Sequence, residues 1–442
     1  MFSAGRRVTV LLTTLLCSVA VGIGGASAGV AAHARHRHVS AVAHRTHRRD
    51  ARHRRARRHG IGPYAAGAHR GLPAARVLAG TRQIRTRVIV VLRNQLHSLP
   101  ATRRRVHARI AAEASADAMI EADVARSGGR VYRRYHALNA FAASVSTAER
   151  SALVSNSQVA AVIPDVVVQL PQFDSGPVNR NAALGSTNTT GQVCPSDPSK
   201  PLLEPEALQT THTAYADSST PQAQSIATGQ GVKVAFFADG IDVNNPDLIR
   251  ADGSHVIIDY HDFSGEGPNA PSNSLEAFGD ASSIAAQGNT VYDLSKFVNP
   301  RYPLPPGCNI TVRGVAPGAS LIAIKVFGAT DSAYNSVVLQ GLDYALTNDH
   351  PDVISESFGG YPIPDSTQDL LRQFNEQAVS DGVTVVEGAG DSGVQASPSS
   401  SASDPAVIAA GASTTFQNYA QGTQYGAQFA KNGWLNDNIS SV

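Results

Sequence analysis

The hydrophobic and polar positions divide the chain into two patterned regions. From residue 231 onward, continuous apolar runs alternate with segments of helical period. Unbroken apolar runs are typical of parallel strands buried on both faces. Their alternation with helices predicts an α/β fold with a doubly wound parallel sheet. The expected strands are residues 232–238, 320–328, 352–360, 383–393 and 405–413, and the expected helices are residues 336–349 and 367–382.

The earlier region, residues 86–170, has the pattern of a small α+β domain. The expected elements are a strand over 86–92, a helix within 102–128, a hairpin over 130–146, a helix over 147–157 and a strand over 158–171. Thr147 is the expected N-cap of the second helix, because a hydroxyl there can accept a backbone N–H. The order β-α-β-β-α-β is that of the ferredoxin-like split βαβ fold.

The remaining segments differ in composition. Arg6, Arg7, an apolar run and "ASA" at 26–28 predict a cleaved signal peptide over residues 1–28. No later run of ~18 apolar residues follows, so we expect a secreted protein with no membrane segment after signal cleavage. Residues 29–80 have the composition of a disordered leader rich in His and Arg. Residues 171–222, rich in Pro, Ser and Thr, are interpreted as a linker.

The leader leaves several interpretations open. Between residues 33 and 70 it holds eight His and eleven Arg. Such residues can bind metal ions, respond to acid or bind polyanions, and a cleavable basic leader is the simplest interpretation. No Phe, Tyr or Trp stands among the basic residues before Gly60. Stacking on nucleic-acid bases is therefore not indicated, and no nucleic-acid partner is expected.

The formal net charge of +2 conceals a basic front half and an acidic back half. Opposite charges of this kind favour docking of the basic front half on the acidic back half. The alternative is an acidic surface joined to a solvated basic arm.

Two cysteines remain once the signal is removed, Cys194 and Cys308. In an oxidising compartment such a pair is expected to form a disulfide. Without a CxxC spacing the pair makes a poor zinc site, and no metal site is predicted.

Polar clusters follow several predicted strands. Asp239 and Asp242 follow the first strand, and "SFGG" and "GAGDSG" follow two others. Catalytic groups in such sheets lie beyond the carboxyl ends of the strands, so we expect a site there. Asp242 is better explained as a turn-stabilising side chain in "DGID".

The segment from Tyr135 to Asp165, "YHALNAFAASVSTAERSALVSNSQVAAVIPD", resembles the inhibitory propeptide of subtilisin-type proteases. That family has a Tyr, then Leu-Asn-x-Phe-x-Ala, a helix and a Val-x-x-Val-x-x-Asp strand. The resemblance implies a domain that assists folding and binds its own protease intramolecularly. Its C-terminal tail, here around "PDVVVQLPQFD", would lie across the active cleft.

From about residue 228 to the end, the chain resembles a subtilisin-like catalytic domain through "ADGIDVNNPDL" and "GVAPGASLIAIKVFG". The resemblance places the family's catalytic Asp at Ala238, followed by Asp239, and its catalytic His at Asp280. "SESFGG" corresponds to the substrate-binding strand, with Ser357 and Gly359. Calcium as a cofactor would be implied by this resemblance alone.

The departures from that pattern indicate proton transfer by carboxyl groups. In "GAGDSG", Asp391 stands where the family has an amide that donates to the oxyanion, and a carboxyl can donate only when protonated. Sedolisins, the acid-active relatives of subtilisins, use Ser with Glu and Asp, and an Asp in the oxyanion hole. "EAFGD" places Glu276 and Asp280 at i and i+4, on one face of a helix, and Asp239 would be an auxiliary carboxylate. The competing interpretation is that Glu276 and Asp280 are surface loop acids.

The sequence thus predicts a secreted serine-type endopeptidase of the subtilisin/sedolisin type, made as a zymogen. The propeptide domain would span residues 86–170 and the peptidase domain residues 228–442. No Gly-Thr-Ser segment occurs in the sequence, so the peptidase domain is expected to be cut short before its nucleophile. The expected substrate is extended polypeptide, paired with the backbone near Ser357 and Gly359. The alternatives are a catalytically inactive peptide-binding relative and a cell-surface interaction module without protease activity.

Overall fold

The computed structural model describes residues 85–170, 194–214, 221–267, 276–297, 304–359, 368–390, 399 and 401–412. The predicted signal peptide, the leader and Asp391 lie outside the described residues. Among the helices of these ranges, none is both long enough and apolar enough to cross a membrane.

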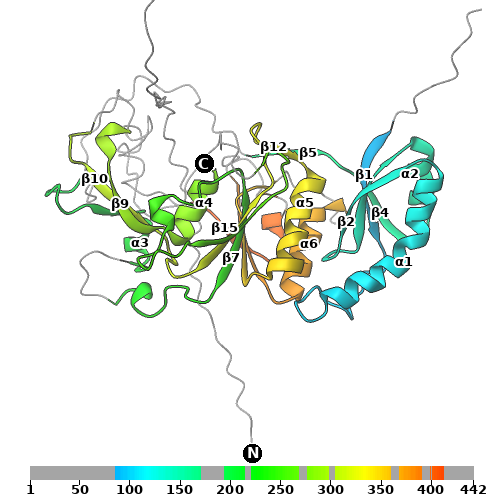
Figure 1. Cartoon of the computed structure of the whole chain (residues 1–442), viewed down its shortest axis with the longest axis horizontal. Coiled ribbons are helices and arrows are strands. Elements are labelled where there is room, and N and C mark those ends of the chain that lie inside the picture. Colours follow the sequence, from blue (N-terminus) through cyan, green and yellow to red (C-terminus); the bar gives the residue numbers. More distant parts are fainter. Residues whose placement is uncertain are drawn as a thin grey trace, which may run out of the picture. The chain divides into compact units, whose positions relative to one another are not determined.

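The N-terminal domain is a four-stranded sheet with two helices (Figure 1). The strand order is β2-β3-β1-β4, and each neighbouring pair is antiparallel. Its elements are β1 (Thr86–Leu92), α1 (Val106–Arg126), β2 (Arg130–Tyr135), β3 (Ala140–Val145), α2 (Thr147–Val154) and β4 (Val159–Pro164). One face of the sheet packs on the helices, with Val90 of β1 in the same apolar cluster as Ile120 and Leu153. The predicted α+β fold and its element order are confirmed.

The N-cap of α2 is one residue earlier than predicted. The hydroxyl of Ser146 accepts the backbone N–H of Glu149, and the Glu149 carboxylate accepts the backbone N–H of Ser146. This reciprocal pair is a capping box, which requires Ser or Thr three residues before the Glu. Only Ser146 has that spacing, so Thr147 is the first helical residue.

The main domain is built on a six-stranded parallel sheet in the order β15-β14-β13-β7-β11-β8. The strands are β7 (Lys233–Ala238), β8 (Ile257–Asp262), β11 (Ser320–Lys325), β13 (Val353–Glu356), β14 (Thr384–Gly388) and β15 (Ile408–Ala410). Helix α4 (Glu276–Ala285) lies on one face, and α5 (Asn335–Tyr344) and α6 (Leu370–Ser380) lie on the other (Figure 1). In β7, Phe236 packs in the cluster with α4, and Phe237 packs in the cluster with α5 and α6. The predicted doubly wound α/β fold is confirmed.

Strand β8 was not predicted, because its sequence "IIDYHD" lacks an apolar run. Among the described strands it is an edge strand, paired with β11. Ile257 is its only buried residue, and the others are partly or fully exposed. An edge position needs little apolar surface, so the sequence signal is weak.

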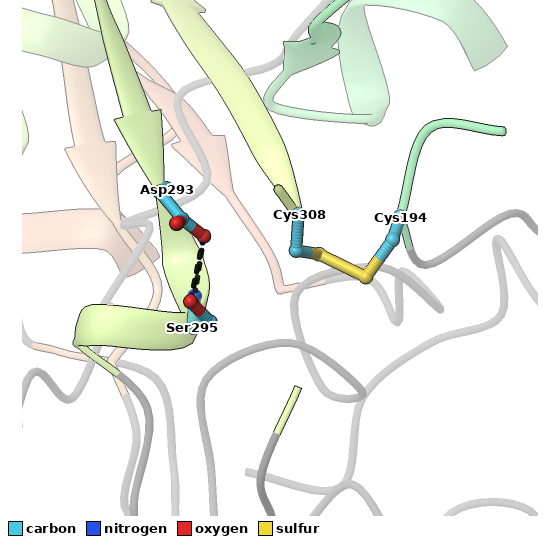
Figure 2. The surroundings of a disulfide bond; sticks show 4 residues. All are labelled: Cys194, Asp293, Ser295 and Cys308. Carbon is cyan, nitrogen blue, oxygen red and sulfur yellow. Dashed lines mark hydrogen bonds between the residues drawn. A yellow bond between two sulfur atoms is a disulfide. The ribbon is translucent and has the colours of Figure 1, made fainter. Parts of the chain in front are cut away.

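A smaller sheet has the order β6-β10-β9, with β6 (Leu202–Glu204), β10 (Asn309–Arg313) and β9 (Gln287–Asp293). Helix α3 (Ala207–Thr210) follows β6. Cys194 and Cys308 form a disulfide that joins the segment before β6 to the residue before β10 (Figure 2). Residues 194–214, interpreted from composition as part of a linker, therefore belong to the folded body. Strand pairing and the disulfide hold a segment whose polar composition gives no such signal.

The tail of the N-terminal domain contributes a strand to the main domain. Strand β5 (Val167–Gln169) pairs antiparallel with β12 (Ser332–Tyr334). The shorter elements are the 3-10 turns η1 (Ala223–Ser225), η2 (Pro246–Leu248), η3 (Leu294–Lys296) and η6 (Ser401–Ser403), and the π-helical turn η4 (Ala345–Asp349) after α5.

Candidate active site

The candidate site lies where the strand order of the main sheet reverses. From β7, the chain places β8 and β11 on one side and β13, β14 and β15 on the other. Asp239 directly follows β7, and Ser357 directly follows β13, its neighbour in the sheet. The carboxyl ends of strands at such a switch point form the usual ligand crevice of an open parallel sheet. The fold therefore brings these two polar residues to the expected edge.

Asp239 anchors the start of helix α4. Its side chain is buried, and Oδ1 accepts the backbone N–H of Ala277 at 3.0 Å. A carboxylate in the first turn of a helix satisfies an otherwise unpaired N–H and interacts favourably with the helix dipole. Asp239 thereby positions the helix that carries Glu276 and Asp280.

Asp280 is a buried acid hydrogen-bonded to a serine. The Ser357 hydroxyl donates to Oδ1 of Asp280 at 2.6 Å, whereas Oδ2 is buried and has no hydrogen-bond partner among the described residues. Burial raises the pKa of Asp280 well above its ordinary value, and the nearby charges of Glu276 and Asp239 raise it further. The hydrogen bond from Ser357 acts in the opposite direction. Asp280 therefore keeps its proton at a pH at which an ordinary Asp is ionised.

The structure brings Asp239, Glu276, Asp280 and Ser357 together. Glu276 begins α4, and the helix continues through Gly279. Since Asp280 lies on a helix and is only 6% exposed, the interpretation of these acids as a surface loop pair is wrong for Asp280. Catalytic roles for the acids stay predictions.

Two further predicted residues lie near this edge of the sheet. A Cβ atom on Gly359 would come within 2.6 Å of Ser399 Cβ, so glycine is required for that close approach. Asp242 is exposed and accepts the backbone N–H of Asn244 at 2.9 Å, which fits the expected turn role.

Two histidines of the main domain make contacts of their own. The ring of His261 stacks on Tyr344 with centroids 4.3 Å apart, and the ring of His255 contacts the Val243 carbonyl at 3.1 Å. The charges that act on Asp280 come from the carboxyl groups of Glu276 and Asp239. Within the described ranges, no cluster of three or more His, Cys, Asp or Glu could hold a metal ion.

The edge of β12 is a binding element that the sequence analysis missed. It receives β5 as an added strand, and the N–H of Leu170 then donates to the Asp331 carbonyl at 2.8 Å. The Leu170 side chain is 2% exposed and joins the apolar cluster of Phe327 and Phe358. A three-residue strand has no readable periodicity, so the sequence analysis named only Ser357 and Gly359 as the strand that pairs with a substrate.

Comparison with known proteins agrees with this arrangement. Residues 229–436 match the model of the subtilase family, Peptidase S8, and residues 87–171 match the model of peptidase inhibitor I9. The main domain therefore belongs to the subtilase family. The predicted inhibitory propeptide is thus confirmed as an I9 domain, whereas the relation of the main domain to sedolisins stays a prediction.

The relatives of this chain are bacterial proteases. It is 32% identical to Subtilisin NAT of Bacillus subtilis subsp. natto over 208 residues, which cover 46% of this chain and 46% of that protein. It is 34% identical to an alkaline protease of Alkalihalobacillus alcalophilus over 244 residues, which cover 52% and 54%. The chain therefore spans about half the length of the curated relatives it matches. Among solved structures, fervidolysin from Fervidobacterium pennivorans is 16% identical with a TM-score of 0.44, covering 76% of this chain and 44% of that chain.

Proposed function

We propose that this subtilase chain is the zymogen of a secreted serine-type endopeptidase in which carboxyl groups move the protons. The observation that carries the proposal is the pairing of the chain's own Val167–Gln169 with β12. Addition of an extended peptide to a strand edge gives main-chain affinity and leaves alternate side chains for pockets. The tail is held as a polypeptide substrate would be held.

The bound tail leads toward the acids. Leu170 shares its apolar cluster with Phe358, and the preceding residue, Ser357, donates to Asp280. A substrate that follows the path of the tail would therefore reach the carboxyl ends of β7 and β13. The same geometry supports inhibition by the I9 domain while the tail remains in place.

In the proposed mechanism each described residue has a separate task. Asp280, once ionised, accepts the proton of the nucleophilic hydroxyl and returns it to the leaving amine. The charge of Glu276 helps to raise the pKa of Asp280, because two close acids cannot both ionise readily. Asp239 holds α4 in place, and Ser357 orients the Asp280 carboxylate. Asp391 would donate to the oxyanion in its protonated form, which favours activity in acid.

The full-length secreted protein tests the proposal. A fluorophosphonate probe should label one serine, identified by mass spectrometry, and casein hydrolysis between pH 3 and 8 should be fastest on the acid side. Asp280→Asn should reduce hydrolysis by at least about 10²-fold, the usual contribution of a general base. Asp242→Asn, in a turn outside the acid cluster, is the matched control. A neutral optimum that Asp280→Asn leaves unchanged would refute the carboxylate mechanism.

A second candidate function is peptide binding without catalysis. It is favoured by Ala238 at the position of the family's catalytic Asp and by Asp280 at the position of its His. The β12 edge would still bind extended peptides in that case. An absence of both probe labelling and hydrolysis, together with binding of a peptide of residues 166–173 to the Leu170→Asp variant, would support this alternative.

A further inference from the structure

Two buried glutamates on neighbouring strands have no part in the mechanism proposed above. Glu356 ends β13, Glu387 lies in β14, and the parallel register pairs them directly. They are 1% and 0% exposed. Asn375 of α6, also buried, donates from Nδ2 to Glu356 Oε2 at 2.7 Å and to Glu387 Oε2 at 3.4 Å. An uncharged amide thus stands where two buried carboxylates would need a cation.

Among the described residues, the charged groups around the two glutamates do not neutralise them. Asp369, at the N-cap of α6, adds a negative charge that acts on both. Arg372 on the same helix is directed to Glu376, at 3.0 Å, and to Asp404, at 3.7 Å. Two ionised glutamates would therefore repel each other inside an apolar layer.

The hydrogen-bond pattern favours Glu356 as the protonated member of the pair. Glu387 Oε1 accepts the hydroxyls of Ser399, at 3.0 Å, and Ser401, whereas the buried Oε1 of Glu356 has no partner among the described residues. Glu387, with more donors, is the better carboxylate, and a protonated Glu356 can donate to it. Burial raises the pKa of both groups, to about 7 for Glu387, and the hydrogen bond between the carboxyls raises the pKa of Glu356 further.

Ser399 connects this pair to the substrate-binding strand. Its Cβ lies 2.6 Å from the position that a Cβ on Gly359 would occupy, and Glu387 Oε1 lies 3.2 Å from the same position. The Ser399 N–H donates to the Ala389 carbonyl at 3.0 Å, beyond the end of β14. Ser399 therefore lies between the end of β14 and the segment after β13. It contacts that segment at Gly359, which is two residues after Ser357.

We propose that Glu356 and Glu387 share a single proton and act as positioning residues, holding Ser399 against Gly359 and so fixing the Ser357–Gly359 strand for substrate. The expected effect on substrate binding rests on the proposed function, whereas the expected effect on the ends of β13 and β14 does not. Loss of the shared proton leaves two adjacent buried carboxylates, whose repulsion separates the ends of β13 and β14. Substrate binding should then weaken as the pair loses its proton, independently of the titration of Asp280.

Glu356→Gln tests this directly, because the amide keeps a donor toward Glu387 and has no proton to lose near neutral pH. In the wild type, exchange of the amide hydrogens of residues 352–359, corrected for the intrinsic pH effect, should increase from pH 6 to pH 8.5. In Glu356→Gln that increase should be abolished. Glu376→Gln, on the exposed face of helix α6, is the control and should behave as the wild type. An unchanged pH-dependent increase in Glu356→Gln would overturn the proposal.

The same variants give a kinetic readout if the protein hydrolyses peptides. For a fluorogenic peptide of residues 166–173, wild-type KM should rise by about tenfold for each pH unit above the last ionisation of the pair. In Glu356→Gln KM should stay within about twofold over that range, with kcat retaining its own pH profile. A pH effect of this size on kcat, with KM unchanged, would overturn the positioning role.

If Glu356→Gln does not fold, Ser399→Ala takes its place. Removal of the hydroxyl should raise the exchange of residues 352–359 already at pH 6, while Ser403→Ala, in the same segment, should not. Equal exchange in both serine variants would overturn the link through Ser399. A protein without any hydrolytic activity would disprove the proposed function, but the exchange measurements would still decide this proposal.

Discussion

Asp165 of the I9 domain caps helix α5 of the subtilase domain through Ser336. Its Oδ1 accepts the Ser336 N–H and its Oδ2 accepts the Ser336 hydroxyl, both at 2.8 Å. Arg87 and Tyr132 of the I9 domain donate to Oδ2 at 2.9 and 2.8 Å. One fully buried carboxylate therefore joins the sheet of the first domain to a helix N-terminus of the second.

Removal of this carboxylate should destabilise the docked pair of domains. We expect Asp165→Ala to lower the free energy of unfolding by about 3–5 kcal/mol, because it leaves the buried Ser336 N–H and the Arg87 charge without their partner. Urea denaturation of the full chain measures the effect. Asp123→Asn removes an exposed ion pair with Arg126 and should cost less than about 1 kcal/mol. Equal losses in the two variants would contradict the capping role.

A second carboxylate acts across the same interface in the opposite direction. Asp343 of α5 accepts the backbone N–H groups of His136, at 2.5 Å, and Ala137, at 2.7 Å. Burial raises the pKa of Asp343 to about 6, the charge of His136 lowers it and that of Glu113 raises it. The folded state therefore binds more protons than the unfolded state between pH of about 4 and 6.

Stability should accordingly fall as pH rises through that window. The contribution of Asp343 is fully present below its unfolded pKa and lost above about pH 6, with an upper limit of about 3 kcal/mol. The difference between the urea midpoints at pH 4 and pH 6.5 should be smaller in Asp343→Asn than in the wild type. Asp349→Asn serves as a comparison. Burial raises the pKa of Asp349 to about 6 as well, and this residue lies at the end of η4. An identical pH dependence in the wild type and Asp343→Asn would disprove the assignment.

The sequence predicts the fold well where burial is complete. The apolar runs of β7, β11 and β13 have neighbours on both faces, so local sequence and tertiary environment agree. The prediction fails at β8, β6 and β12, because edge and short strands are stabilised by pairing partners that are distant in the chain. The same reason explains the misassigned linker around residues 194–214.

The candidate site shows the same division. The i, i+4 spacing of Glu276 and Asp280 is local, so a sequence can reveal it. The hydrogen bond from Ser357 to Asp280 and the docking of Asp165 on Ser336 depend on which strands and domains meet, and no local pattern encodes them. The pair of Glu356 and Glu387 was also missed, since each stands alone at the end of an apolar strand and only the register places them together.

The disulfide should make a large contribution to stability. Cys194 and Cys308 are separated by 114 residues in the sequence. Closing a loop of roughly that length reduces the entropy of the unfolded chain and so raises its free energy by about 4–5 kcal/mol at room temperature. The double variant Cys194→Ser/Cys308→Ser should therefore unfold at a markedly lower urea concentration than the wild type. Reduction of the wild type should lower its midpoint to that of the variant. A variant as stable as the oxidised wild type would show that the segment around Cys194 is held by the pairing of β6 with β10 alone.

The buried acid at the centre of the candidate site should destabilise the protein at neutral pH. The folded state raises the pKa of Asp280 well above its ordinary value, chiefly by burial. Its contribution to stability is therefore fully present in acid and lost as pH rises through the folded pKa.

Asp280→Asn keeps an acceptor for the Ser357 hydroxyl but carries no charge. Its free energy of unfolding should therefore equal that of the wild type at pH 4 and exceed it at pH 8 by on the order of 1 kcal/mol or more. Ser357→Ala removes the hydrogen bond that favours the ionised form and should lower stability most at pH 8. Urea denaturation at both pH values distinguishes these outcomes, and a loss of stability in Asp280→Asn at pH 8 would mean that the carboxylate is stabilised by its surroundings.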